Sequence, residues 1–189
     1  MRKIVLFLHQ SLDGYCATTT GGLEWIPYNG ALEKYAEGIV QSVGIAMYGR
    51  KTYELMKGYW PALLNAESAT EHEKEHAQWI EGIEKIVFST TLDKEEWNNT
   101  RVISDSVEEE VKKLKEGEGK DLVIFGSPTL AFSLMQMDLI DEFQFTVSPV
   151  VLGQGLTFIR KIEKQYNLEL VHSEQIEGGI MALHYKIVK

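Results

Sequence analysis

Tyr48-Gly49-Arg50-Lys51-Thr52 marks the point where a predicted strand, Ile45–Tyr48, ends and a predicted helix, Thr52–Lys57, begins. Gly49 allows a tight turn between the two elements. The backbone N–H groups of a new helix point outward, and Arg50 and Lys51 add two cations beside them, which suits a phosphate group. A surface turn with two solvated basic side chains explains the same residues equally well. The choice between these two interpretations depends on the rest of the chain.

Apolar runs rich in β-branched residues alternate with helical patterns along most of the chain. The predicted strands up to residue 137 are Ile4–Leu8, Ile45–Tyr48, Lys85–Ser89, Arg101–Ile103 and Leu122–Phe125. The predicted helices are Ala31–Val43, Thr52–Lys57, Thr70–Ile80, Ser106–Lys115 and Ser127–Met137. Ser106 and Glu109 fit a capping box. This alternation predicts an α/β fold with parallel strand pairs.

The C-terminal part of the chain has a different pattern. Three predicted strands, Glu142–Val147, Glu169–Glu174 and Ile180–Val188, follow one another without a helix between them. Glu177-Gly178-Gly179 lies between the last two and is a hairpin signal. We therefore expect a mixed, mostly parallel sheet with an antiparallel C-terminal edge.

Two further strand ends carry residues of the same character as Gly49-Arg50-Lys51-Thr52. Ser89-Thr90-Thr91 follows one strand, and its hydroxyls can bind a phosphate or cap a turn. Gly126-Ser127-Pro128-Thr129-Leu130 follows another, with Ser127 as a suitable N-cap and Pro128 suited to the first helical position. No GxGxxG motif occurs, so an ordinary Rossmann site is not indicated. Because ligands of open α/β sheets bind at the carboxyl ends of strands, the three segments together favour a nucleotide site.

Composition limits the possible classes of function. The 189 residues are 44% hydrophobic, as expected for one globular domain spanning residues 1–189. The net charge of −9 argues against binding to DNA or RNA, which needs a basic surface. No apolar run reaches the roughly 18 residues of a membrane helix. The single cysteine, Cys16, and the lack of a recognisable export signal predict a cytoplasmic protein.

His72-Glu73-Lys74-Glu75-His76 matches the HExxH motif of zinc proteases, and Glu95 and Glu96 lie at a plausible spacing for a third ligand. Zinc-binding helices of this kind are usually buried near the metal, whereas this one is almost wholly charged. A solvated helix face is therefore the favoured interpretation. No metal is predicted, and a zinc hydrolase remains a remote alternative.

Asp13 in Ser11-Leu12-Asp13-Gly14 is the candidate catalytic carboxylate, although Asp-Gly is also a turn signal. Four aromatic residues can stack on a planar ligand or pack in the core: Trp25, Tyr28, Tyr59 and Trp60.

Five segments in chain order together resemble the dihydrofolate-reductase-like superfamily. They are Ser11-Leu12-Asp13-Gly14, Tyr48-Gly49-Arg50-Lys51-Thr52-Tyr53-Glu54, Val87-Phe88-Ser89-Thr90-Thr91, Gly126-Ser127-Pro128-Thr129-Leu130 and Ser148-Pro149-Val150-Val151-Leu152-Gly153-Gln154-Gly155. The resemblance is closest to the C-terminal reductase domain of the bifunctional riboflavin-biosynthesis deaminase-reductase, in its stand-alone bacterial form. It implies a three-layer fold with about eight strands, an NADPH cofactor and a homodimer.

The resemblance also implies how NADPH would lie across the strand ends. Cationic and hydroxyl side chains would surround the adenosine 2′-phosphate: Arg50, Ser89, Thr90 and Thr91. Two helix starts would hold the pyrophosphate: Gly49, Lys51 and Thr52 on one side, and Gly126, Ser127, Pro128, Thr129 and Leu130 on the other. The segment from Gly14 to Thr18, which includes Ala17, would form a mobile loop near the nicotinamide.

The expected substrate residues are Trp25, Asn29 and Phe125. Asn29 stands near the position where dihydrofolate reductases carry a carboxylate. Phe7 and Phe125 stand where riboflavin-pathway reductases carry a lysine and a glutamate. We therefore expect a reductase of a planar heterocycle, resembling 5-amino-6-(5-phosphoribosylamino)uracil reductase but with a less charged substrate. The alternatives are a dihydrofolate-reductase-like activity and a nucleotide-binding module without catalysis.

Overall fold

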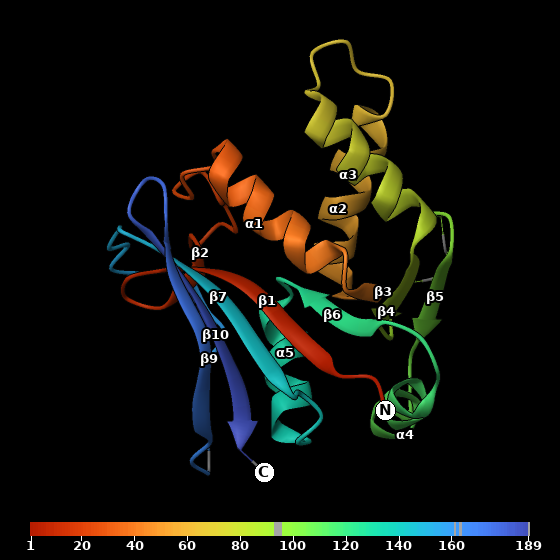
Figure 1. Cartoon of the computed structure of the whole chain (residues 1–189). Helices are drawn as coiled ribbons and strands as arrows, with labels where there is room; N and C mark the ends of the chain where they lie inside the picture. The colour runs from red at the N-terminus through yellow and green to blue at the C-terminus, as the bar shows by residue number, and fades with distance from the viewer. Residues whose placement is uncertain (93–95, 161, 163, 189) are drawn as a thin grey trace.

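An eight-stranded sheet forms the centre of the computed structural model, which describes residues 1–92, 96–160, 162 and 164–188 (Figure 1). The strand order is β5-β4-β3-β6-β1-β7-β10-β9. The strands are β1 (Ile4–Ser11), β3 (Val43–Gly49), β4 (Glu84–Phe88), β5 (Thr100–Ile103), β6 (Asp121–Phe125), β7 (Glu142–Ser148), β9 (Asn167–Ile176) and β10 (Ile180–Val188). Every neighbouring pair from β5 to β7 is parallel, and β10 is antiparallel to both of its neighbours. The predicted mixed sheet with an antiparallel C-terminal edge is confirmed.

Helices cover both faces of this sheet and make three layers (Figure 1). One face carries α1 (Gly30–Val40), α2 (Arg50–Leu63) and α3 (Glu71–Gly82), and the other carries α4 (Val107–Glu116) and α5 (Pro128–Gln136). None of these helices, within the part of the chain that is described, is long and apolar enough to cross a membrane.

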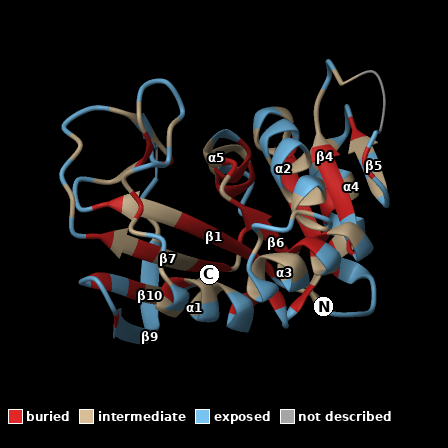
Figure 2. Ribbon diagram, turned by 90° about the horizontal axis from the view of Figure 1, so that it is seen from above, coloured by how far each residue is buried: buried red, intermediate tan, exposed pale blue. Residues whose placement is uncertain are grey.

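Strand alternation divides the apolar core between the two faces. On β1, Ile4 and Leu6 pack toward α4 and α5, whereas Val5 and Phe7 pack toward α1, α2 and α3. All four side chains are buried, and burying an aliphatic side chain of this size stabilises the fold by about 1.5–3 kcal/mol. Figure 2 shows the resulting contrast between the buried central strands and the exposed edge strand β9.

A second, two-stranded sheet lies beyond the end of β1. It pairs β2 (Tyr15–Ala17) with β8 (Leu156–Thr157), and neither strand was expected from the sequence. Gly155 is needed here because an added Cβ would lie 2.3 Å from the carbonyl oxygen of Ala17. The segment from Gly14 to Thr18, predicted to be a mobile loop, is therefore mostly a paired strand.

Two predicted helices end three or more residues away from their predicted ends, and the others differ by one or two residues. The first ends at Val40 instead of Val43, because Val43 already pairs with Asp121 as the first residue of β3. The second continues past Lys57 to Leu63, through the unfavourable residue Pro61. Its last turns are supported by tertiary packing, which overrides helix propensity.

The predicted capping box at Ser106 and Glu109 was wrong. Ser106 has a left-handed backbone, with φ of 49°, and its side chain makes no capping hydrogen bond among the described residues. The capping box belongs to α3, where Thr70 and Glu73 hydrogen-bond each other's backbone N–H groups.

A buried carboxylate at the start of β7 links this strand to the middle of β10 and to the residue before β1. Glu142 accepts a hydrogen bond from Lys3 Nζ at 2.8 Å and lies 2.9 Å from His184 Nε2. Burial raises the pKa of Glu142, but the hydrogen bonds and charges of Lys3 and His184 outweigh it and hold that pKa below its ordinary value. A carboxylate whose pKa is lowered by folding stabilises the fold above its unfolded pKa, and this contribution disappears as the pH falls through the folded pKa.

Glu142→Gln should therefore lower the free energy of unfolding near pH 7 by about 1–3 kcal/mol. The difference from the unmodified protein should shrink below about pH 4, where an unfolded glutamate becomes protonated. Urea unfolding followed by circular dichroism over a pH series measures both effects. Glu116→Gln, which alters an exposed carboxylate, is the control and should change little. A Glu142→Gln difference that stays constant down to pH 3 would contradict the assignment.

Candidate cofactor and substrate site

The N-termini of α2 and α5 lie side by side because they follow adjacent parallel strands, β3 and β6. The backbone N–H of Gly49 donates a hydrogen bond of 3.0 Å to Ser127 Oγ, which joins the two strand ends. A Cβ added at Gly126 would lie 3.8 Å from Thr52 Cγ2, and one added at Gly49 would lie 3.8 Å from Leu130 Cβ. The sequence-predicted pyrophosphate residues of the two segments are therefore brought together.

The turn before α5 has an unusual backbone. Gly126 has φ of 60° and Ser127 has φ of 46°, so two successive residues are left-handed. This conformation is costly for a serine, by roughly 1–2 kcal/mol. Ser127 occupies the predicted N-cap position, and Pro128 the first turn, but the Ser127 hydroxyl does not cap α5. It turns instead toward Gly49.

The starts of α2 and α5 both lack compensation for the helix dipole. The N-cap of α2, Gly49, has no side chain, and the side chain of Ser127 accepts no hydrogen bond from α5. Neither first turn, all of it described, contains an acidic residue. The other three helices differ. Asn29 caps α1, Thr70 caps α3, and α4 has three glutamates in its first turn. Free N–H groups and two uncompensated positive dipole ends at one place make a site suited to an anion.

Cationic side chains surround this pair of helix starts. Arg50 is 2.9 Å from Glu54, but both side chains are more than two-fifths exposed, so this pair is weak and leaves Arg50 able to bind another anion. Lys51 is exposed. Arg160 donates a hydrogen bond of 3.1 Å to Thr129 Oγ1 in the first turn of α5. Sequence reasoning missed Arg160, because it lies in an irregular segment 31 residues after Thr129 and belongs to no motif.

The hydroxyl segment after β4 lies one strand further along the sheet. Gly49 is opposite Phe88, so Ser89 lies next to the start of α2. Ser89 Oγ accepts hydrogen bonds from the N–H groups of Thr91, at 3.1 Å, and Leu92, at 3.0 Å. Its hydrogen remains available to a ligand. Thr90 and Thr91 are exposed. This segment is therefore a capped turn whose hydroxyls flank Arg50.

Asp13 connects the end of β1 to the segment between β7 and β8. Its carboxylate accepts hydrogen bonds from the Ser11 hydroxyl at 2.7 Å and from the N–H groups of Leu152 at 3.1 Å and Gly153 at 2.7 Å. The hydrogen bond from Ser11, above all, lowers the pKa of Asp13, so the group is an ionised acceptor and not a proton donor near neutral pH. These contacts explain Asp13 as an anchor, and its catalytic role stays a prediction.

The three predicted substrate residues lie in different environments. Asn29 Oδ1 accepts from the N–H groups of Ala31 and Leu32, and its Nδ2 donates to the Glu177 carbonyl at 3.2 Å. A carboxylate could not make the last of these bonds. Trp25 packs in a small apolar cluster formed by α1 and the β9–β10 hairpin, and its Nε1 has no partner among the described residues. Phe125 is buried at the end of β6.

Phe125 belongs to a continuous row of rings across the face that carries α1, α2 and α3. Successive centroids are 4.1–6.2 Å apart in the order Tyr59, Trp60, His76, Trp79, Phe125, Phe7, His9 and Tyr28. The two end rings, Tyr59 and Tyr28, are exposed. Of the four aromatic residues proposed from the sequence, three lie in this row, at its two ends.

The HExxH motif is accounted for by contacts within this region. Glu73 completes the cap of α3, and His76 lies between the rings of Trp60 and Trp79. Burial, followed by the neighbouring His72, lowers the pKa of His76 to about 4. Glu96 pairs with Lys57, and Glu95 lies outside the described residues. Among the residues that are described, no group of three or more histidine, cysteine or acidic side chains could hold a metal.

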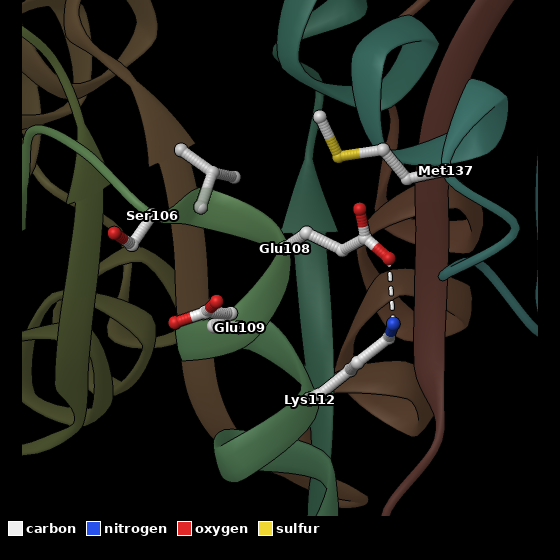
Figure 3. A pocket seen from close by; sticks show the side chains of 6 residues that line it. Ser106, Glu108, Glu109, Lys112 and Met137 are labelled. Atoms are coloured by element: carbon white, nitrogen blue, oxygen red, sulfur yellow. Dashed lines mark hydrogen bonds and ion pairs between the residues drawn. The ribbon is translucent and has the colours of Figure 1, made fainter.

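An open hollow of about 450 Å³ lies at the start of α4 (Figure 3). It is lined by Ser106, Val107, Glu108, Glu109, Lys112 and Met137, and Glu108 pairs with Lys112 across 2.5 Å. Its glutamates make it unsuited to a phosphate, and it shares no residue with the starts of α2 and α5.

Comparisons with known proteins identify the family and the fold of the chain. Residues 2–182 match the model of the RibD C-terminal domain. The chain is 30% identical over 187 residues to the uncharacterized protein YyaP of Bacillus subtilis (strain 168), covering 97% of the chain and 94% of YyaP. A putative riboflavin biosynthesis protein from Shewanella sp. PV-4 has a TM-score of 0.78 at 18% identity, covering 99% of both chains. Dihydrofolate reductase from Enterococcus faecalis, complexed with NADP(H) and RAB-propyl, has a TM-score of 0.64 at 15% identity, covering 99% of this chain and 97% of that one. The dihydrofolate-reductase-like fold is thus confirmed, and the chain belongs to the RibD C-terminal domain family.

Proposed function

We propose that this protein is an NADPH-dependent reductase of a planar heterocyclic substrate. The observation that carries the proposal is the pair of uncapped helix N-termini joined by Gly49 and Ser127. A pyrophosphate carries two negative charges and accepts many hydrogen bonds, so it fits two converging sets of N–H groups. When bound, NADPH supplies a hydride, while the protein supplies orientation and exclusion of water.

Each cationic group has a distinct part in this proposal. Lys51 and Arg160 flank the two helix starts and complement the pyrophosphate. Arg50 is the first residue of α2, next to the strand end that carries Ser89, and in this proposal its guanidinium binds the 2′-phosphate. Only NADPH, and not NADH, carries that phosphate. A planar guanidinium can bind it through two parallel hydrogen bonds.

The substrate side supports a less charged ligand than the riboflavin-pathway pyrimidine. By the resemblance, Phe7 and Phe125 stand where the reductases of that pathway carry a lysine and a glutamate. In this protein the two rings lie edge to face, with centroids 6.2 Å apart, and both are buried. Asn29 is used as a helix cap, so it does not replace the carboxylate of a dihydrofolate reductase.

Turnover separates an enzyme from a nucleotide-binding module without catalysis. Protein and NADPH are incubated with dihydrofolate, with the riboflavin-pathway pyrimidine and with a set of small cyclic imines, and absorbance of the reduced cofactor is followed. Oxidation of NADPH that depends on one of these substrates supports the reductase. Tight NADPH binding without turnover on any of them favours the binding module.

Arg50→Ala should weaken NADPH binding about 10- to 100-fold and leave NADH binding nearly unchanged, because the lost hydrogen bonds are to a charged phosphate. Calorimetric titration of both cofactors measures the two affinities. Arg101→Ala is a matched control, since Arg101 is similarly exposed and also pairs with glutamates. Equal affinity of the unmodified protein for NADPH and NADH would refute the proposed role of Arg50.

Lys51→Glu should weaken cofactor binding without lowering the stability of the fold. A glutamate in the first turn of α2 favours the helix by about 0.3–1 kcal/mol, so the melting temperature should stay the same or rise. The same charge should repel the pyrophosphate and weaken NADPH binding by about tenfold or more. Lys34→Glu makes an identical charge change on α1 and should leave binding intact. The idea fails if Lys51→Glu binds NADPH as well as the unmodified protein does.

We propose that the expected homodimer forms through the edge of the large sheet. Every residue of β9 except Ile176 is exposed, including Leu168, Leu170 and Val171. An exposed apolar edge strand is an unfavourable surface for a monomer, so we propose that a second copy covers it. Light scattering should show a dimer that Leu170→Lys converts to monomers, whereas Leu55→Lys on α2 should not. A monomeric unmodified protein would exclude this arrangement.

A further inference from the structure

The face of the sheet that carries α1 changes from apolar to polar at the ends of β1 and β7. Phe7, His9 and Ser11 follow one another at alternate positions of β1, so their side chains share that face. The strand register pairs His9 with Thr146 and Ser11 with Ser148. Four polar side chains therefore lie together directly beyond the buried ring of Phe7.

His9 is the central member of this group. Its Nδ1 hydrogen-bonds Thr146 Oγ1, which fixes the ring orientation. Its Nε2 is 3.5 Å from the hydroxyl of Tyr28, at the outer limit of a hydrogen bond. Tyr28 is 63% exposed and is the last ring of the aromatic row, so its hydroxyl can move away from His9. Nε2 is thus the ring nitrogen that a ligand can reach.

The imidazole is uncharged under ordinary conditions. Burial lowers the pKa of His9 to about 4, although the residue as a whole is only half-buried. A neutral imidazole has one donor and one acceptor nitrogen. Asp13, the carboxylate that Ser11 of this group contacts, already accepts hydrogen bonds from Ser11, Leu152 and Gly153. Recognition at this place therefore uses uncharged donors and acceptors.

Ser148 gives an independent indication that a ligand binds here. Its side chain is 1% exposed, and its hydroxyl has no hydrogen-bond partner in the part of the chain that is described. Buried hydroxyl groups are nearly always paired, because an unpaired one loses its hydrogen bonds to water. An unpaired hydroxyl beside His9 and Thr146 is explained if a bound molecule supplies the missing partner.

We propose that His9, positioned by Thr146, and Ser148 form the recognition site for the polar edge of an uncharged lactam heterocycle, with His9 determining specificity. A lactam edge presents a carbonyl acceptor beside an N–H donor, which matches groups that can both donate and accept. The plane of the heterocycle lies against the exposed ring of Tyr28. The role of this site in substrate recognition rests on the proposed reductase function. Binding of a lactam to the site can be measured separately.

Lumazine, a fluorescent bicyclic lactam, is a suitable probe. Its affinity is measured from fluorescence near neutral pH, with NADP⁺ present, because NADP⁺ cannot deliver a hydride. We expect saturable binding that His9→Ala and Ser148→Ala each weaken about five- to tenfold, the effect of one lost hydrogen bond. His9→Gln keeps a donor and an acceptor and should recover part of the affinity. His172→Ala, which removes an exposed histidine on β9, is the control.

Ser148→Ala is the decisive variant. Removal of an unpaired buried hydroxyl should leave the melting temperature unchanged or raised, so weaker binding cannot be attributed to damage to the fold. A purely structural Ser148 would give unchanged lumazine affinity, which would overturn the proposal. Failure of lumazine to bind the unmodified protein would also overturn it.

A separate titration with NADPH distinguishes this proposal from the proposed function. Loss of lumazine binding in the variants with NADPH affinity intact supports the lactam site. An unmodified protein that binds lumazine through His9 but does not bind NADPH would refute the reductase and leave the lactam site standing.

Discussion

The hydrogen bond from the Gly49 N–H to Ser127 Oγ is the interaction on which the candidate site depends. It joins the ends of two adjacent parallel strands and so fixes the spacing of the helices that follow them. It also removes the Ser127 hydroxyl from its usual task of capping α5. The first N–H groups of α5 therefore have no partner from an N-cap side chain, and those of α2 have none because their N-cap, Gly49, has no side chain. This hydrogen bond and the glycine N-cap together set the position and the chemistry of the candidate anion site.

Under the proposed function, this arrangement gives up local helix stability in favour of cofactor binding. The cap residues of α1 and α3 satisfy their helix starts, and α4 has acidic residues near its positive end. The helices α2 and α5 have neither a side-chain N-cap nor an acidic residue in the first turn, and Ser127 also has a left-handed backbone. Missing helix caps and strained backbone that occur together are typical of functional sites, because binding of a ligand there can compensate for the lost stability. Two such departures on adjacent helices are harder to explain as chance than either alone.

Sequence reasoning worked where the signal was local. Alternating apolar runs located the strands of the large sheet, and Gly178 and Gly179, both with positive φ, form the predicted hairpin. The strand-end segments at Gly49 and Gly126 were located for the same reason. Features that depend on distant contacts were missed or misjudged. Thr129 meets Arg160 only in the folded chain, β2 is a strand only because β8 pairs with it, and Ser106 has the residue type of a cap but not the backbone of one.

The surroundings of His9 also depend on contacts between residues that are distant in the sequence. In the sequence it is one polar residue in an apolar strand, and nothing distinguishes it from a solvated edge position. The register with β7 places Thr146 and Ser148 beside it, and only then does a polar group emerge at the end of an aromatic row. Its uncharged state agrees with the neighbouring Phe7 and Phe125, because an environment that removes water from a ligand also disfavours charge. Under the two proposals, such a site would separate two tasks: the charge of the cofactor would be bound at the uncapped starts of α2 and α5, and the identity of the substrate would be determined by the neutral polar groups at the ends of β1 and β7.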